Sequence, residues 1–288
     1  MRGDLATRRF VTVRGEAVDV LTSGVYRYNA RAVAAEGVGL DAVTLFLVVP
    51  ALFIALAFVR RGSLRATLFT IGLLAYLLYQ YLEYAVFLAY GPLFLLYVAT
   101  FALSLTAIAL LVARIDLGGL GARFARGFPR RSVIALGVFM AVLLCAMWLP
   151  LVLRTMGGST GTALAGATTM VVQAFDLGLL VPLGIATAVT VYRRSPAGYL
   201  LASVVVVKAC AMATAIASML VVEWMATGVL AIGFIAVFAL TAMGSAILAV
   251  KVYKSVGPPG ASPASSDPLT IHERTYSSPR RILRELGA

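Results

Sequence analysis

Charge is scarce in this chain of 288 residues, where Asp, Glu, Lys and Arg together make up only 12%. A soluble domain carries about twice that share. The chain has one His and two Cys, too few for a disulfide framework or a His/Cys metal site. Hydrophobic residues instead make up 61%, and the mean hydropathy is +0.96. These proportions exclude a disordered chain, a collagen and an ordinary cytosolic enzyme.

Seven apolar runs are long enough to cross a bilayer, which takes about 20 residues. They are Gly39–Val59, Ala66–Tyr90, Leu93–Val112, Val133–Leu153, Met170–Val191, Tyr199–Val222 and Thr227–Val250. Hydrocarbon offers backbone groups no other partners, so each run must be a helix. The sequence therefore predicts an all-α polytopic membrane bundle of seven transmembrane helices at 39–254. An extracytoplasmic segment, 1–38, precedes this bundle, and a flexible basic cytoplasmic tail, 255–288, follows it.

Basic residues gather in alternate loops, and this pattern predicts the orientation of the helices. One side holds Arg60, Arg61, Arg65, Arg114, Arg123, Arg126, Arg130, Arg131, Arg193, Arg194, Lys251 and Lys254. The loops of the other side hold only Arg154. Positive loops favour the cytoplasm, so we predict an N-terminus outside and a C-terminus inside. The arginines of the N-terminal segment disagree, but several independent loops outweigh them. The net charge is +12. We expect the basic residues of the cytoplasmic loops to contact the bilayer and its anionic lipids rather than nucleic acid.

Three ionisable residues, Glu83, Asp176 and Lys208, fall inside these runs. Each costs about 2.5–3.5 kcal/mol at mid-membrane, so each should face a partner or a water-filled cavity. Gln80 and Gln173 share a helix face with the two acids. We predict that these five residues line a substrate site.

Each charge also has a simpler interpretation. Glu83 lies among tyrosines that are typical of an interfacial aromatic belt. Asp176 lies near the start of its run, where a negative charge interacts favourably with the helix dipole. Lys208 can extend toward the inner surface, although about 15 Å is long for its side chain. Its neighbours are small alanines, which indicates a helix–helix contact instead. Because helical side chains lean toward their own N-termini, we predict that Glu83 rather than Asp176 pairs with Lys208.

Two prolines, Pro50 and Pro182, lie inside the first and fifth runs and are predicted hinges. The pattern Asp41…Val49-Pro50…Arg60-Arg61 resembles Asp176…Val181-Pro182…Arg193-Arg194, although the spacing differs by several residues. A real likeness would make the two parts a parallel repeat joined by the fourth run.

Several longer motifs, quoted next, are moderately specific. They are Arg60-Arg61-Gly62-Ser63-Leu64-Arg65, Tyr79-Gln80-Tyr81-Leu82-Glu83-Tyr84, Pro92-Leu93-Phe94-Leu95-Leu96-Tyr97-Val98, Asp176-Leu177-Gly178-Leu179-Leu180-Val181-Pro182-Leu183 and Gly198-Tyr199-Leu200-Leu201…Val207-Lys208. Over roughly residues 26–219 the chain resembles a family of uncharacterised prokaryotic multi-pass membrane proteins. That resemblance implies the seven-helix fold and a prokaryotic plasma membrane, and it implies no activity.

Three classes of function remain open from the sequence. A small-solute or proton-coupled transporter fits the buried charges, the prolines and the repeat. A sensor or scaffold that signals through its basic tail, and a lipid-modifying enzyme with Glu83 or Asp176 as general base, are the alternatives. No nucleotide loop, zincin motif or haem ligand pair is present, which leaves a bound lipid or quinone open. The sequence does not indicate the oligomeric state.

Overall fold

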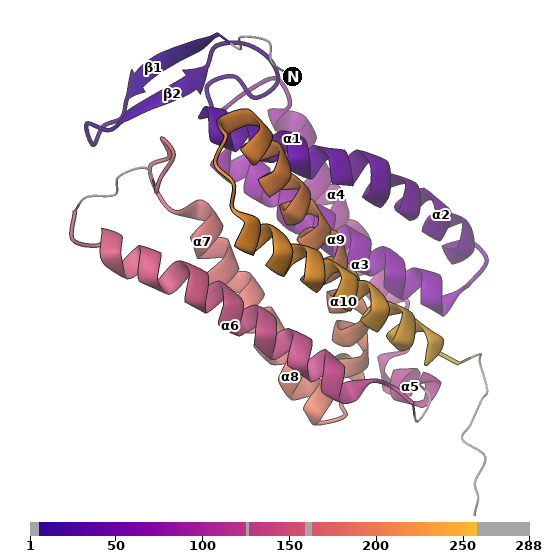
Figure 1. Cartoon of the computed structure of the whole chain (residues 1–288). Helices are drawn as coiled ribbons and strands as arrows, with labels where there is room; N and C mark the ends of the chain where they lie inside the picture. The colour runs from indigo at the N-terminus through magenta and orange to yellow at the C-terminus, as the bar shows by residue number, and fades with distance from the viewer. Residues whose placement is uncertain (1–5, 125–126, 159–162, 258–288) are drawn as a thin grey trace, which may run out of the picture.

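The computed structural model describes residues 6–124, 127–158 and 163–257. Figure 1 shows a bundle of long helices with a two-stranded hairpin at one end, which we call the hairpin end. The opposite end, which we call the arginine end, contains the short helix α5 (Leu117–Leu120) and the Arg60–Arg61 and Arg193–Arg194 turns. Most of the predicted tail, and Arg126 among the basic loop residues, lie outside the described part.

The hairpin pairs β1 (Thr7–Val11) with β2 (Ala17–Leu21) in antiparallel register. Between the hairpin and the first helix, the Tyr26 hydroxyl donates a 2.6 Å hydrogen bond to Asp41 Oδ2. Burial, reinforced by the negative charge of Asp41, raises the pKa of Tyr26 above its ordinary value. The N-terminal segment is therefore attached to the bundle through a buried, protonated phenol.

The helices follow the apolar runs, and each predicted run corresponds to one of them with ends that differ by a few residues. They are α1 (Arg31–Val43), η1 (Thr44–Val48), α2 (Val49–Val59), α3 (Leu64–Phe87), α4 (Phe94–Ala113), α5, η2 (Gly121–Arg123), α6 (Arg130–Thr155), α7 (Val171–Phe175), η3 (Asp176–Leu180), α8 (Val181–Tyr192), α9 (Pro196–Thr227) and α10 (Ile232–Lys254). The largest difference is at the first run, whose helix begins at Arg31 rather than Gly39.

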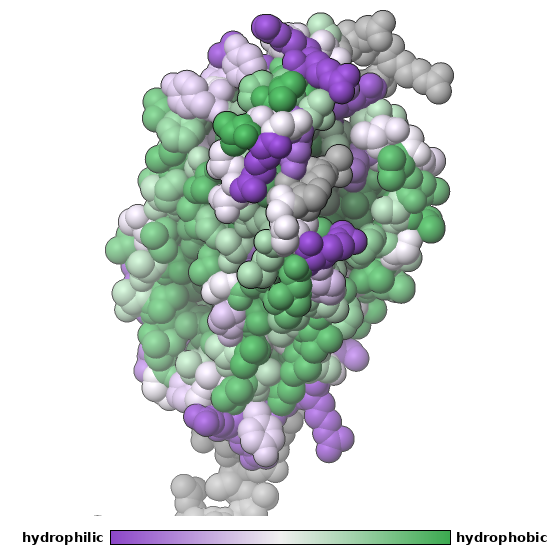
Figure 2. Space-filling view, turned by 90° about the vertical axis from the view of Figure 1, so that its left-hand side faces the viewer, coloured by the Kyte–Doolittle hydropathy of each residue, from purple (hydrophilic) through white to green (hydrophobic). Residues whose placement is uncertain are grey.

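Among the described residues, six helices are long and apolar enough to cross a membrane. They are Arg31–Val59, Phe94–Ala113, Arg130–Thr155, Val171–Tyr192, Pro196–Thr227 and Ile232–Lys254. The remaining predicted run, Ala66–Tyr90, corresponds to α3. This helix is not among the six, because its tyrosines, Gln80 and Glu83 lower its mean hydropathy. Figure 2 shows a wide hydrophobic belt between hydrophilic residues at the two ends of the molecule. Exposed side chains such as Phe46, at 83%, fit a surface that faces lipid. The chain thus has the helical bundle of a multi-pass membrane protein.

The two prolines mark an irregularity that occurs twice. In each case a five-residue π-helix precedes a helix whose second residue is proline: η1 precedes Pro50, and η3 precedes Pro182. Proline has no N–H to donate to the previous turn, and the wider π-turn accommodates this loss. Both prolines therefore lie where the helix geometry changes, while hinge motion at them stays a prediction.

The likeness continues at a constant offset of 132 residues. This offset takes Thr44 to Asp176, Pro50 to Pro182, Gly62 to Arg194 and Ser63 to Ser195. Gly62 and Arg194 both have positive φ, at 76° and 56°. Ser63 and Ser195 both cap the next helix by accepting a hydrogen bond from the amide three residues later.

The described helices thus contain two copies of one unit, from α1 to α4 and from α7 to α10, with α6 between them. Both copies begin at the hairpin end, as a parallel repeat requires. The structure corrects the sequence alignment at one point, because the counterpart of Asp176 is Thr44 and not Asp41. The predicted repeat had the right prolines but an acid in the wrong position.

Loops and side chains close the bundle at the arginine end. Phe124 stacks on Tyr199 with ring centroids 4.8 Å apart, and Arg130 donates a 3.2 Å hydrogen bond to the Tyr199 hydroxyl. Arg65 donates to the backbone carbonyl of Val256 just after α10. These contacts join the loops before and after the long helices into one layer.

Candidate functional site

A cavity of about 1050 Å³ lies in the hairpin half of the bundle. Its walls come from α1, α3, α6, α7, α9 and α10, and it extends to the hairpin, because residues 16–19 also line it. Toward the arginine end α6 and α8 meet closely. A Cβ built on Gly137 would lie 2.6 Å from the Gly184 carbonyl oxygen. The cavity therefore occupies the half of the bundle beyond this close contact.

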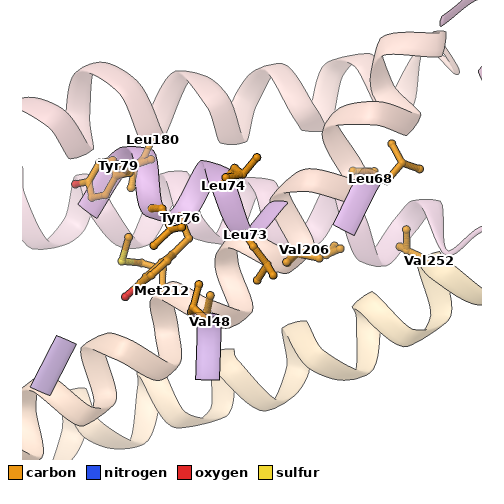
Figure 3. Close-up of a cluster of buried hydrophobic side chains, with 14 of the residues drawn as sticks. Val48, Leu68, Leu73, Leu74, Tyr76, Tyr79, Leu180, Val206, Met212 and Val252 are labelled. Carbon is orange, nitrogen blue, oxygen red and sulfur yellow. The ribbon is translucent and has the colours of Figure 1, made fainter. Parts of the chain in front are cut away.

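In Figure 3 a buried hydrophobic cluster runs from Tyr79 and Met212 at one side to Leu68 and Val252 at the other. Tyr79 and Met212 belong to both the cavity wall and this cluster. Leu68, Val206 and Val252 lie at its far end and are completely buried. The cluster therefore separates the cavity from the arginine end.

The structure brings the predicted site residues together. Gln80, Glu83, Gln173 and Asp176 all line the cavity, from α3 and from the α7–η3 segment. The fifth, Lys208 on α9, is not part of the wall but is buried beside it, at 3% exposure. That burial excludes the interpretation in which Lys208 extends to the inner surface.

Both carboxylate oxygens of Asp176 accept hydrogen bonds from neighbouring helices. The Tyr79 hydroxyl of α3 donates to Oδ1, and the Trp148 indole N–H of α6 donates to Oδ2 at 2.7 Å. Asp176 is only 7% exposed, so it is not a helix-terminal charge in contact with bulk water. The π-helix that begins at Asp176 places this carboxylate between α3 and α6, where it holds three elements together.

Lys208 makes a different contact from the predicted one. Its Nζ lies 4.4 Å from the centroid of the Tyr79 ring, a cation–π arrangement. The same Nζ has no hydrogen-bond partner in the part of the chain that the structure describes. The predicted direct pair between Glu83 and Lys208 is therefore not formed. Both acids lie within electrostatic range of Lys208, but the tyrosine ring occupies its immediate surroundings.

Gln80 and Glu83 are two polar residues of the wall whose side chains have unpartnered groups in the described part of the chain. Gln80 is 2% exposed, and its side-chain Nε2 has no partner among the described residues. The side chain of Glu83, one turn further along α3, has no hydrogen bond or ion pair within the described ranges. An amide and a carboxyl kept without partners in an apolar bundle cost free energy, and a bound ligand or water can offset that cost.

Among the helices, sequence reasoning missed two further acids of the cavity, Glu36 on α1 and Glu223 on α9. They lie within electrostatic range of each other. Each falls just outside a predicted run, since the first run was taken from Gly39 and the sixth ended at Val222. The signal that would have found Glu36 is the helical spacing of Val33, Gly37 and Leu40 around it, because all three are buried on one face.

The repeat explains why the cavity lies on one side of the bundle. Gly39 lets α1 approach α9 so closely that a Cβ on it would lie 2.5 Å from the Met219 Cα. At the corresponding place in the second unit the offset puts Val171 opposite Phe87. There α7 contacts α3 much less extensively than α1 contacts α9, and Phe87 lines the cavity. The cavity therefore lies in the interface that the second unit leaves open.

Comparisons with family models, curated proteins and solved structures found no match. The resemblance to prokaryotic membrane proteins thus rests on the quoted motifs, and the structure supports it as far as a multi-pass helical bundle.

Proposed function

We propose that this chain is a transporter for a small solute, in which all seven long helices cross a prokaryotic cell membrane. The hairpin end faces outward and the arginine end faces the cytoplasm, where positive loops are favoured. α3 crosses with its polar face toward the cavity and its neighbours, so its lower hydropathy needs no lipid contact.

The single observation that carries this proposal is the cavity with the unpartnered Glu83 and Gln80 in its wall. It lies between two copies of one structural unit, which is where transporters built from repeats place their substrate site. It is also one-sided, since the buried cluster and the Phe124–Tyr199 stack close the arginine end. This combination is that of a binding site held in an outward-facing state.

Transport then requires the two interfaces to exchange their spacing. The α7–α3 interface closes over the solute while the α1–α9 interface opens toward the arginine end. The π-helical segments before Pro50 and Pro182 are the places where the entry helices can bend. The residues exposed by this change are those at the far end of the buried cluster, Leu68, Val206 and Val252.

Thiol accessibility tests the proposal on the full chain in liposomes. The background carries Cys145→Ser and Cys210→Ser, so that added cysteines are the only ones. A membrane-impermeant maleimide supplied at the hairpin side should label Ala213→Cys, on the cavity wall. Supplied at the arginine side, it should slowly label Val206→Cys, which the outward-facing state buries completely.

Thr187→Cys, equally buried on α8, is the control for unfolding. Labelling of Val206→Cys without labelling of Thr187→Cys supports alternating access. If Val206→Cys never reacts, while the denatured chain does, the cavity is one-sided. That result contradicts a transporter and favours a receptor or sensor.

A further inference from the structure

We infer that the cavity binds an organic cation with a large apolar body. This inference rests on the proposed function, since it names the class of solute for that same site. It follows from the distribution of charge in the cavity, the chemistry of its walls and the unpartnered amide of Gln80.

The charge of the cavity wall is strongly one-sided. Its acidic residues are Glu16, Asp19, Glu36, Glu83, Asp176 and Glu223. Its only basic residue among the described lining residues is Arg31, which is exposed near the hairpin. A low-dielectric pocket lined by one sign of charge attracts the opposite sign.

Two of the buried charges offset each other, and three acids do not. Asp176 has two hydrogen-bond donors and Lys208 nearby, so this pair leaves little net charge. Glu36, Glu83 and Glu223 have no hydrogen bond to their carboxylates and no ion pair within the described part of the chain. They come from α1, α3 and α9, so three carboxyl groups without partners reach the cavity from three helices, where a cationic ligand would stabilise their ionised form.

The rest of the wall suits an apolar cation better than a hydrated one. Phe87, Phe139, Trp148, Phe234 and Phe238 supply aromatic faces, to which cations are attracted. Methionines such as Met147 and Met212 add flexible, polarisable surface that adapts to different shapes. Among the described residues, no three acids, His or Cys lie close enough together to hold a metal ion. The acids are spread along a wide cavity, as an extended organic cation requires.

Gln80 provides the second, independent sign of a ligand. It is 2% exposed, it lines the cavity, and its Nε2 lacks an acceptor among the described residues. Glu83 is one turn away on the same helix face. A ligand with a cationic group beside a hydrogen-bond acceptor can satisfy both residues.

Two probes of matched size and opposite charge test the inference: tetraphenylphosphonium and tetraphenylborate. Binding of each is measured by scintillation proximity to the full-length protein purified in an uncharged detergent. We expect saturable binding of the phosphonium and none of the borate above the detergent background. Glu83→Gln should weaken phosphonium binding by about tenfold or more, because it removes one buried charge and keeps the side-chain shape.

Asp116→Asn is the matched control. It is the same carboxylate-to-amide change on a helix cap at the arginine end, and asparagine caps equally well. Both variants must elute as a single species in size exclusion. Borate binding equal to phosphonium binding, or no effect of Glu83→Gln on affinity, overturns the inference.

The binding test does not depend on transport. Phosphonium binding without labelling of Val206→Cys from the arginine side keeps the inference and rejects the transporter. Labelling from both sides without selective phosphonium binding keeps the transporter and rejects the cation.

Discussion

Lys208 lies on the face of Tyr79, with its Nζ 4.4 Å from the ring centroid. The hydroxyl of the same ring donates to Asp176. One aromatic side chain therefore contacts a buried cation through its face and a buried carboxylate through its edge. This arrangement keeps two opposite charges in the interior without a direct ion pair, so both stay buried while the cavity beside them remains free.

Tyr79→Phe separates the two contacts, because it removes the hydroxyl and keeps the aromatic face. We expect a loss of about 1–2 kcal/mol in unfolding free energy, typical of a buried hydrogen bond to a charged group between membrane helices. Tyr79→Leu should cost about 1 kcal/mol more, since it also removes the cation–π contact. Thermal unfolding of the full chain in detergent measures both.

Tyr90→Phe is the control for Tyr79→Phe, because Tyr90 is 78% exposed and lies just after the end of α3. Its melting temperature should equal that of the wild type. A Tyr79→Phe variant as stable as Tyr90→Phe would show that the bond to Asp176 contributes nothing to the fold.

The positions of the helices could be predicted from the sequence because bilayer thickness fixes the length of an apolar run. The burial of Asp176 and Lys208 could also be predicted, since charges in apolar runs avoid lipid. Their contacts could not. The direction in which helical side chains lean predicted an ion pair between Glu83 and Lys208. It did not indicate that the ring of Tyr79 would lie against Lys208 Nζ.

The cavity was beyond sequence reasoning for a related reason. It depends on the difference between Gly39, which permits close approach to Met219, and Val171, which stands at the same place in the second unit. That comparison needs the offset of 132 residues, and the π-helices and positive φ angles that confirm the offset are properties of the backbone. From the sequence, the two prolines indicated a repeat but not its exact alignment.

Gly184→Ala tests the close contact that limits the cavity toward the arginine end. A Cβ on Gly184 would lie 2.7 Å from the Gly137 carbonyl oxygen, so α6 and α8 must move apart. We expect a loss of about 1–3 kcal/mol, the usual cost of overpacking. Gly244→Ala on α10, where nothing lies within 4 Å, should be neutral or slightly stabilising. Equal melting temperatures for the two variants would contradict the contact.

Tyr26 predicts a pH dependence of stability. Burial and the charge of Asp41 raise the pKa of Tyr26, so the folded chain keeps this proton at a pH where the unfolded chain loses it. The contribution of Tyr26 is therefore fully present below about pH 10, the ordinary tyrosine pKa, and declines above it. The difference in melting temperature between wild type and Tyr26→Phe should stay constant up to that pH and then narrow. A difference that stays constant above that pH would exclude the linkage.

Trp148 can report the sign of charge in the cavity, because it lines the wall and is one of only two tryptophans. Trp224→Phe makes it the single fluorophore. At constant ionic strength in an uncharged detergent, caesium should quench its emission more steeply than iodide, because an acid-lined cavity concentrates cations and excludes anions. Glu36→Gln combined with Glu83→Gln should reduce this difference, whereas quenching by neutral acrylamide should stay the same if access is unchanged. Iodide quenching as strong as that by caesium would mean that the carboxyls of the cavity are neutral, and the charge argument for its ligand would fail.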